Sequence, residues 1–327
     1  MKKDFISIAD WHSKELNEIL KISKKIKTSP EKFSKALAGK SVALIFEKQS
    51  LRTHVTFEIG LKQMGAHTVY LTQSDISLGL RESNYDLAKN LERWVDAIVI
   101  RTYAQKNIEE LATYSNRSVI NALSDHEHPC QAVGDIFTIQ EHFGKLKGLK
   151  LVWIGDGNNV CHSLMLISAK MGINFTAVTP SGFQPDYEVV TKAMEFAGTS
   201  GAHIELSCNP EEGIESADIV YTDVWVSMGQ EAEKDLKIKE FEGFQVNSRL
   251  MKLAKPTAIF MHCLPAHRGE EVTDDVIDSP QSIVFDQAEN RLYTQKAIVY
   301  TLLNKKIHNN YERKSPARKR PEKKKKK

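Results

Sequence analysis

Short apolar segments that favour strands alternate with amphipathic segments that favour helices along almost the whole chain. The segments that favour strands lie at 41–46, 67–71, 96–101, 118–122, 150–154, 174–178, 203–207, 218–222, 258–262 and 283–285. The segments that favour helices lie at 7–27, 54–64, 84–94, 107–114, 130–143, 159–171, 186–198, 271–277 and 287–306. Repeated strand–helix alternation predicts parallel sheets with helices on both faces.

The number of candidate strands and the length of the chain both predict two domains. A chain of 327 residues exceeds what one hydrophobic core usually supports, and ten strands exceed the needs of one small doubly wound sheet. We therefore expect an α/β protein with two doubly wound parallel-sheet domains, residues 1–147 and 148–290, joined by helices. The last helix, within 291–308, would be free to pack back on the first domain.

The basic character of the chain is confined to its end. The net charge is +3, but residues 312–327 hold ten Lys or Arg against two Glu, so the other residues carry about −5. Residues 309–327 are rich in Lys, Arg, Pro and Glu and should be disordered. The acidic body gives no electrostatic support to a nucleic-acid partner.

The remaining composition is typical of a globular protein of the cytoplasm. No apolar run approaches the ~18 residues of a membrane span, and the N-terminal residues lack a signal-peptide core. Cys130, Cys161, Cys208 and Cys263 are far apart in sequence and form no C-x-x-C pair. This spacing argues against a zinc site or a disulfide framework, and we expect no bound metal.

One segment after the first predicted strand combines two hydroxyls and a guanidinium in a short turn. Ser50, Arg52 and Thr53 lie between the strand-like run 41–46 and the helix-like run 54–64. Together with the free backbone N–H groups of a helix N-terminus, these side chains suit a phosphate dianion. A plain N-cap at Ser50 with a solvated Arg52 has the same spacing, so the spacing alone leaves both interpretations open.

Two familiar phosphate-binding patterns are incomplete. Gly155 and Gly157 follow a predicted strand, but Val160 occupies the third glycine position of a dinucleotide-binding turn. The segment 39–41 ends like a P-loop, but Ser34 replaces its first glycine and the segment precedes its strand. We interpret both as structural.

Written in full, residues 46–58 contain F-E-K-x-S-L-R-T-x-x-x-F-E, which resembles the carbamoyl-phosphate loop of the aspartate and ornithine carbamoyltransferases. The resemblance continues from about residue 5 to residue 306. It implies two α/β domains with the C-terminal helix packed on the first, and domain closure on binding. It also implies a homotrimer with active sites at the subunit borders, and neither a metal nor an organic cofactor.

The first part of the resemblance concerns carbamoyl phosphate. The residues it assigns to this substrate are Ser50, Leu51, Arg52, Thr53, Arg101, His128, Gln131, Cys263, Leu264 and Arg291. Arg101 ends a buried strand, where α/β folds bind ligands, although an arginine on the rim of the sheet is the alternative. Residues 128–131 match the family's H-P-x-Q segment. As donors, Arg101, His128 and the Gln131 amide would stabilise negative charge on the carbonyl oxygen.

The second part concerns the amine that accepts the carbamoyl group. The segment 155–159 resembles the ornithine enzymes, which implies that Asn159 contacts the α-carboxylate. Residues 222–230 match their D-x-x-x-S-M-G segment, so Asp223 would pair with the α-ammonium while Ser227 and Met228 cover the head group. Ordinary loop packing remains the alternative for Met228.

Cys263 follows His262 and suggests at first a thiol nucleophile. Neighbours along a strand point to opposite faces, which weakens that interpretation. The resemblance instead places Cys263 near the δ-amine with Asp223, and makes Leu264–Pro265 a cis peptide, which is inexpensive only before proline. Arg101, His128, Gln131, Asp223 and Cys263 are then the catalytic residues.

The chain also departs from the family pattern. His54 replaces a second arginine and Leu51 replaces a threonine found in many relatives. The segment 80–83 lacks the lysine loop of the aspartate enzymes.

The expected activity is transfer of a carbamoyl group from carbamoyl phosphate to L-ornithine. The alternatives are a carbamoyltransferase for another amine, such as putrescine or an acylated ornithine, a non-catalytic anion-binding protein, and a dinucleotide-dependent oxidoreductase. The sequence does not distinguish biosynthetic from catabolic use.

Overall fold

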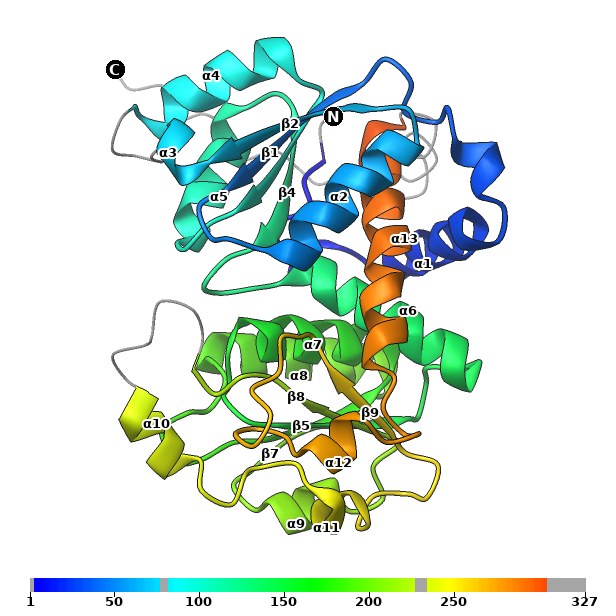
Figure 1. Ribbon diagram of the computed structural model, residues 1–327, viewed down its shortest axis with the longest axis vertical. Helices are drawn as coiled ribbons and strands as arrows, with labels where there is room; N and C mark the ends of the chain where they lie inside the picture. Colours follow the sequence, from blue (N-terminus) through cyan, green and yellow to red (C-terminus); the bar gives the residue numbers. More distant parts are fainter. Residues whose placement is uncertain (1–2, 77–81, 227–233, 305–327) are drawn as a thin grey trace, which may run out of the picture.

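The computed structural model describes residues 3–76, 82–226 and 234–304, in which nine parallel strands form two sheets (Figure 1). The first sheet contains β1 (Ser41–Phe46), β2 (His67–Thr72), β3 (Ala97–Arg101) and β4 (Ser118–Leu123), in the order β2-β1-β3-β4. The second contains β5 (Lys150–Ile154), β6 (Asn174–Val178), β7 (Ile204–Ser207), β8 (Ile219–Thr222) and β9 (Ile259–His262), in the order β7-β6-β5-β8-β9. The predicted class, two doubly wound parallel α/β sheets, is confirmed.

Helices connect the strands and cover the sheets. In the first part of the chain they are η1 (Ile8–Asp10), α1 (Ser13–Thr28), η2 (Pro30–Phe33), α2 (Leu51–Gln63), α3 (Gln73–Ile76), α4 (Asn84–Trp94), α5 (Gln105–Tyr114) and α6 (Pro129–Phe143). In the second part they are α7 (Asn159–Met171), α8 (Tyr187–Ser200), α9 (Pro210–Ile214), α10 (Lys234–Glu240), α11 (Ser248–Met251), α12 (Asp274–Ile277) and α13 (Val284–Leu303). Among the described residues, no helix is long and apolar enough to span a bilayer.

Each sheet buries apolar side chains on both faces because successive residues of a strand point to opposite sides. On β1, Val42 and Leu44 face the helices α1, α2 and α13, whereas Ala43 and Ile45 face α4 and α5. The core on the Leu44 side is continuous with the core under α7 and α8 of the second sheet. One apolar core therefore connects the two sheets.

Helix α13 returns from the second sheet to the first. In Figure 1 this orange helix runs beside α1, α2 and α6, and it contacts all three. The fully buried Ala297, Ile298 and Val299 lie on it. The predicted return of the C-terminal helix is confirmed.

Several boundaries differ from the prediction. The predicted helix 7–27 is divided into η1 and α1, the predicted helix 271–277 is confined to α12, and α13 starts three residues before 287. The segment 283–285 is not a strand, because Ile283 precedes α13 and Val284 and Phe285 begin it. A run of three apolar residues carries too little periodicity to separate a strand from a helix start. Helix α2 begins at Leu51, three residues earlier than predicted, so Arg52 and Thr53 lie in its first turn. The division at residues 147 and 148 remains a proposal, and the tail 309–327 lies outside the described residues.

Candidate functional site

A cavity of about 310 Å³ lies at the carboxyl ends of the strands of both sheets. It is lined by all the predicted site residues that the structure describes: Ser50, Leu51, Arg52, Thr53, Arg101, His128, Gln131, Asn159, Asp223, Cys263, Leu264 and Arg291. The predicted residues Ser227 and Met228 lie outside the described residues. The carboxyl edge of a parallel sheet is where α/β folds bind ligands.

The first wall of the cavity is the N-terminus of α2. Ser50 is the N-cap, and its Oγ accepts a hydrogen bond from the Thr53 N–H at 3.2 Å. The Thr53 hydroxyl in turn accepts one from Arg291 Nη2 at 2.6 Å. This arrangement ties α2 to α13 and leaves the N–H groups of Leu51 and Arg52 in the first turn available to an anion.

Three arginines gather around this helix end. In the part of the chain that the structure describes, no carboxylate forms a salt bridge with Arg52, Arg101 or Arg291. Burial, together with the charges of Arg291 and Arg52, lowers the pKa of Arg101 to about 10. The Nε atoms of Arg101 and Arg291 are buried without a hydrogen-bond partner among the described residues. Such a cluster of mutually repelling cations is stabilised by a bound dianion.

His128 and Gln131 form the next part of the wall, at the start of α6. Burial and the charges of Arg291 and Arg101 lower the pKa of His128 well below its usual value, so the imidazole is neutral. Gln131 Nε2 donates to Asp135 Oδ1 at 2.8 Å, and Gln131 Oε1 has no partner among the described residues. Gln131 therefore offers the cavity an acceptor, whereas the sequence led us to expect a donor.

Asp135 is the centre of a buried hydrogen-bond network behind the cavity. Its carboxylate accepts from Gln131, from Gln287 Nε2 at 2.7 Å and from the Tyr221 hydroxyl at 3.2 Å. Burial raises the pKa of Asp135 to about 6 in spite of these bonds. Sequence inspection missed this residue, although it lies one helical turn after Gln131, where two side chains can meet.

Asp223 and Cys263 form the opposite wall, at the ends of β8 and β9. The Cys263 thiol donates to Asp223 Oδ1 at 3.0 Å, and Asn158 Nδ2 donates to Asp223 Oδ2 at 3.0 Å. Asn158, to which the sequence assigned no role in the site, is also the N-cap of α7. The adjacent Asn159 donates one amide hydrogen to Ser124 O and has a second to offer.

The side chains of His262 and Cys263 do not act as a pair. His262 Nδ1 accepts from the Leu264 N–H at 2.9 Å, and Nε2 lies 3.1 Å from Glu271 Oε1. Burial, followed by the Asp223 charge, raises the pKa of the Cys263 thiol well above its usual value. A neutral thiol whose neighbouring histidine is engaged in other hydrogen bonds argues against a cysteine nucleophile. The Leu264–Pro265 peptide is cis, as the resemblance implied.

The two departures from the family pattern lie in different environments. The His54 ring stacks on Tyr70 and Nε2 lies 2.8 Å from Glu58, outside the cavity lining. Leu51 lines the cavity mouth but is 74% exposed.

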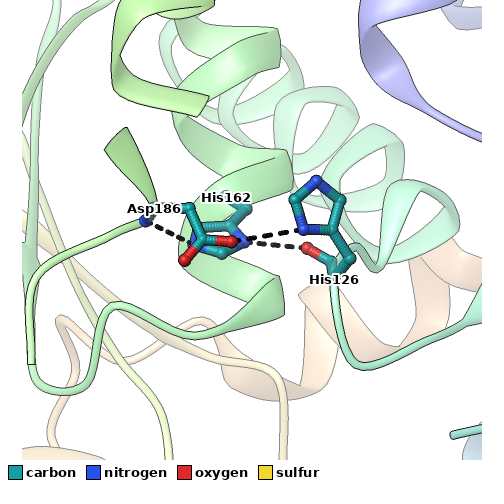
Figure 2. Close-up of side chains that lie close together, drawn as sticks. All are labelled: His126, His162 and Asp186. Carbon is teal, nitrogen blue, oxygen red and sulfur yellow. Dashed lines mark hydrogen bonds and ion pairs between the residues drawn. The ribbon is translucent and has the colours of Figure 1, made fainter. Parts of the chain in front are cut away.

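Within the described parts of the chain, three groups of side chains bring possible metal ligands within 4.8 Å of one another. They are His126, His162 and Asp186; Asp223, His262 and Cys263; and His267, Glu270 and Glu271. In the first group (Figure 2), His162 Nδ1 lies 2.8 Å from His126 O and Nε2 accepts from the Asp186 N–H at 3.1 Å. Both nitrogens of His162, like both of His262, are thus occupied by hydrogen bonds. This favours a structural role for these histidines.

The chain matches two sequence models of one family. Residues 3–141 match the model described as aspartate/ornithine carbamoyltransferase, carbamoyl-P binding domain. Residues 147–302 match the model described as aspartate/ornithine carbamoyltransferase, Asp/Orn binding domain.

Curated proteins and solved structures are similar over almost the full length. The ornithine carbamoyltransferase of Thermococcus kodakarensis is 50% identical over 299 residues, 91% of this chain and 95% of its own. That of Pyrococcus horikoshii is 49% identical over 303 residues, 92% of this chain and 96% of its own. The structure of ornithine carbamoyltransferase from Pyrococcus furiosus superimposes with a TM-score of 0.89 at 48% identity, covering 92% of this chain and 96% of that one.

Proposed function

The chain belongs to the aspartate/ornithine carbamoyltransferase family, and on this premise we propose how its residues carry out the reaction. The protein transfers the carbamoyl group of carbamoyl phosphate to the δ-amine of L-ornithine, giving L-citrulline and phosphate. The observation that carries the mechanism is one cavity with two different walls. One wall holds three arginines that form no salt bridge among the described residues, and the other is an acidic pocket that bears a thiol.

The arginine wall holds the phosphate. Ser50, the first-turn N–H groups of α2, Arg52 and Arg101 surround the dianion, and Arg291 fixes the Thr53 hydroxyl beside it. Binding replaces repulsion among cations by charge-assisted hydrogen bonds, each worth about 1.5–3 kcal/mol.

The carbamoyl group lies between His128, Gln131 and the arginines. The neutral His128 imidazole and Arg101 donate to the carbonyl oxygen, and Gln131 Oε1 accepts from the carbamoyl N–H. Fixed donors lower the barrier because negative charge on this oxygen grows towards the tetrahedral intermediate. Carbamoyl phosphate is already an activated acyl donor, so we propose a reaction without metal or organic cofactor.

Ornithine enters from the other wall. Asp223 pairs with the α-ammonium, and the second amide hydrogen of Asn159 contacts the α-carboxylate. Cys263, between Asp223 and the arginine wall, lies beside the δ-amine. We include Ser227 and Met228 in this pocket on the resemblance alone.

The bond changes are those of acyl substitution. The δ-amine lone pair forms the new C–N bond, the bond from the carbamoyl carbon to the bridging oxygen breaks, and its electron pair leaves with phosphate. The proton lost by the amine passes to the departing phosphate, the strongest base in the cavity. Only a neutral amine has the lone pair required.

We also propose that the protein is a homotrimer or a higher assembly of trimers. Leu51, Val55 and Ile59 form an exposed apolar stripe on α2, with i, i+4 spacing, directly beside the cavity mouth. Such a stripe is suited to burial against another copy. A solution mass near three times the 37.0 kDa of one chain, or a multiple of that mass, supports this proposal, and a monomer mass contradicts it. The free thiols of Cys130, Cys161, Cys208 and Cys263 fit a reducing compartment, and we propose the cytoplasm.

The activity is tested by citrulline formation from carbamoyl phosphate with L-ornithine, putrescine, N-acetylornithine and aspartate as parallel acceptors. We expect ornithine to give a kcat/KM at least 100-fold above the others. N-acetylornithine lacks the α-ammonium and putrescine lacks the α-carboxylate, so each leaves buried polar groups unpaired, a discrimination of roughly 10⁴ in favourable cases. Aspartate keeps both groups but has no δ-amine to place at the carbamoyl carbon. Carbamoylation of another acceptor in preference to ornithine would overturn the assignment of Asn159 and Asp223. No turnover with any of them would favour the anion-binding alternative.

A further inference from the structure

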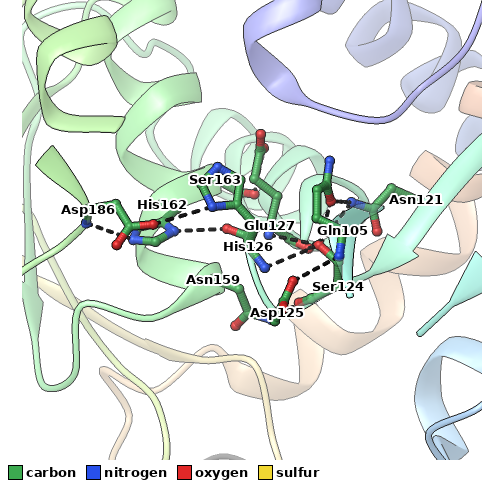
Figure 3. A network of polar contacts seen from close by, with 10 residues as sticks. All are labelled: Gln105, Asn121, Ser124, Asp125, His126, Glu127, Asn159, His162, Ser163 and Asp186. Atoms are coloured by element: carbon green, nitrogen blue, oxygen red, sulfur yellow. Dashed lines mark hydrogen bonds and ion pairs between the residues drawn. The ribbon is translucent and has the colours of Figure 1, made fainter. Parts of the chain in front are cut away.

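One face of α7 binds the backbone of the loop that carries His128. Figure 3 shows this loop, residues 124–128, between β4 of the first sheet and α7 of the second. Asn159, His162 and Ser163 project towards it from neighbouring turns, at i, i+3 and i+4 spacing. They bind main-chain atoms of every second residue of the loop.

The three contacts are hydrogen bonds to main-chain atoms. Asn159 Nδ2 donates to Ser124 O, and His162 Nδ1 lies 2.8 Å from His126 O. Ser163 Oγ accepts from the N–H of His128 at 2.9 Å. The backbone of a residue in the cavity is therefore held by a helix of the other sheet.

The direction of the Ser163 hydroxyl is fixed by Glu127. Ser163 Oγ donates to Glu127 Oε2 at 3.0 Å, and the same oxygen accepts from the Ile8 N–H at 3.1 Å. Glu127 is 2% exposed, so its carboxylate has little access to water as an alternative donor. With its hydrogen committed to Glu127, the Ser163 oxygen presents a lone pair to His128.

The tautomer of His162 is fixed in the same way. Its Nδ1 must carry the hydrogen, because its partner His126 O can only accept, and Nε2 accepts from the Asp186 N–H (Figure 2). Burial lowers the pKa of His162, which keeps Nε2 unprotonated. His126 Nδ1 in turn lies 3.4 Å from Asp186 Oδ2.

We propose that Ser163 and His162 are positioning residues that hold the His128 imidazole at the carbamoyl oxygen. The inference rests on the proposed role of His128 in the transfer reaction. A displacement of about 1 Å at a group that stabilises the transition state can cost up to 100-fold in rate. Because the α7 contacts hold the loop rather than the substrate, their loss should lower kcat more than it weakens substrate binding.

Ser168 provides a matched control on the same helix. It is fully buried like Ser163, but its hydroxyl has no hydrogen-bond partner among the described residues. We expect Ser163→Ala to lower kcat about tenfold, with KM for ornithine within twofold of wild type. Ser168→Ala should leave both kcat and KM for ornithine within twofold of the wild-type values. Wild-type kcat in Ser163→Ala, or equal losses in both variants, would overturn the proposal.

His162 provides a second, independent pair of variants. Asparagine places an amide N–H near the position of Nδ1 and can still donate to His126 O, whereas leucine cannot. We expect His162→Asn to retain more than half of the wild-type kcat and His162→Leu to lose about tenfold. Equal kcat values in the two variants would contradict the role of this hydrogen bond. If Ser163→Ala does not fold, the comparison of His162→Asn with His162→Leu still tests whether α7 positions His128.

Hydrogen exchange tests the same contact without turnover. The full-length protein labelled with [15N]histidine gives one amide signal for each histidine, and His128→Gln identifies the signal of His128. Its exchange should be about tenfold faster in Ser163→Ala and unchanged in Ser168→Ala. If wild type makes no citrulline, the proposed function fails, yet the exchange rates still decide whether Ser163 holds His128. Unchanged exchange in Ser163→Ala would overturn the inference.

Discussion

The orientation of a single amide decides what the cavity offers to the carbamoyl group. Gln131 gives its amide hydrogens to Asp135, so its oxygen faces the cavity. The sequence predicted that Gln131 belongs to the site, but treated the amide as a donor. That distinction depends on the buried carboxylate one helical turn later, and residue types alone do not reveal which end of an amide is occupied.

Replacing Gln131 by methionine should therefore remove an acceptor while keeping the side-chain shape. We expect kcat/KM for carbamoyl phosphate to fall about 100-fold, since one carbamoyl N–H and one Asp135 lone pair are left unpaired in a buried site. Gln140→Met, on the more exposed end of the same helix, is the control and should change this value less than twofold. Steady-state kinetics of both variants test this prediction. If Gln131→Met lowers kcat/KM for carbamoyl phosphate less than threefold, the acceptor role of Gln131 is wrong.

The pH dependence of the reaction should come from the substrate between pH 7 and 8. In this range His128 remains neutral because its pKa is well below 6.5, and Arg101, with a pKa of about 10, remains charged. Cys263 remains a thiol because its pKa is raised. The ornithine δ-amine has a pKa near ~10.4, so its neutral fraction rises about tenfold per pH unit.

We therefore expect kcat/KM for ornithine to increase about tenfold from pH 7 to pH 8. Below pH ~6 the decline should steepen, because Asp135, with a pKa of about 6, then gains a proton and can no longer accept all three of its hydrogen bonds, two at Oδ1 and one at Oδ2. Initial rates in buffers of constant ionic strength test both limbs. A flat profile from pH 7 to pH 8 would mean that amine deprotonation does not limit the rate.

At the scale of the element, the turn between β5 and α7 uses close backbone packing to place Asn159 in the cavity lining and Asn158 against Asp223. A Cβ added to Gly157 would lie 2.2 Å from Pro185 N and 2.7 Å from Phe183 O. Gly157, which resembled part of a dinucleotide-binding turn, is thus needed because the backbone of the 183–185 segment packs directly against it. This agrees with the structural interpretation made from Val160 at the third position.

Gly157→Ala should consequently force the turn away from the 183–185 segment. We expect a stability loss of about 1–3 kcal/mol, as for other overpacked sites, together with a raised KM for ornithine. Gly198→Ala, in α8 with no atom within 4 Å of the added methyl, should raise stability by about 0.5–1 kcal/mol. Denaturant unfolding of the two variants gives both values. Equal stabilities would show that the turn adjusts without cost.

The elements themselves were largely predictable because their burial produces regular patterns. Strands buried on both faces appear as continuous apolar runs, and nine of the ten predicted strands are present within one residue of the prediction at each end. The tenth, 283–285, failed because three apolar residues fit either a strand or the first turn of α13. Helix starts were less accurate, since Leu51 is exposed and carries no periodic signal.

At the scale of the whole molecule, the cavity exists because α13 crosses from one sheet to the other. The helix brings Arg291 to the end of α2 and Gln287 to Asp135, joining groups that are more than 150 residues apart. Periodicity predicts this helix but not where it packs. Its position followed only from the family resemblance, because the contacts that fix it are distant in sequence.

The basic tail should be dispensable for catalysis. The described lining of the cavity extends no further than Arg291, and α13 ends at Leu303. Deleting residues 312–327 changes the net charge from +3 to about −5 but removes none of these residues. We expect kcat/KM for both substrates to stay within twofold of wild type at 0.15 M ionic strength, where charges more than ~8 Å away are largely screened.

Adsorption of the protein to an anionic resin should weaken sharply in the same deletion, since the remaining body is acidic. If the deletion instead abolished citrulline formation, the tail would have to capture an anion as part of the reaction. The residues of the cavity would then not account for the activity by themselves.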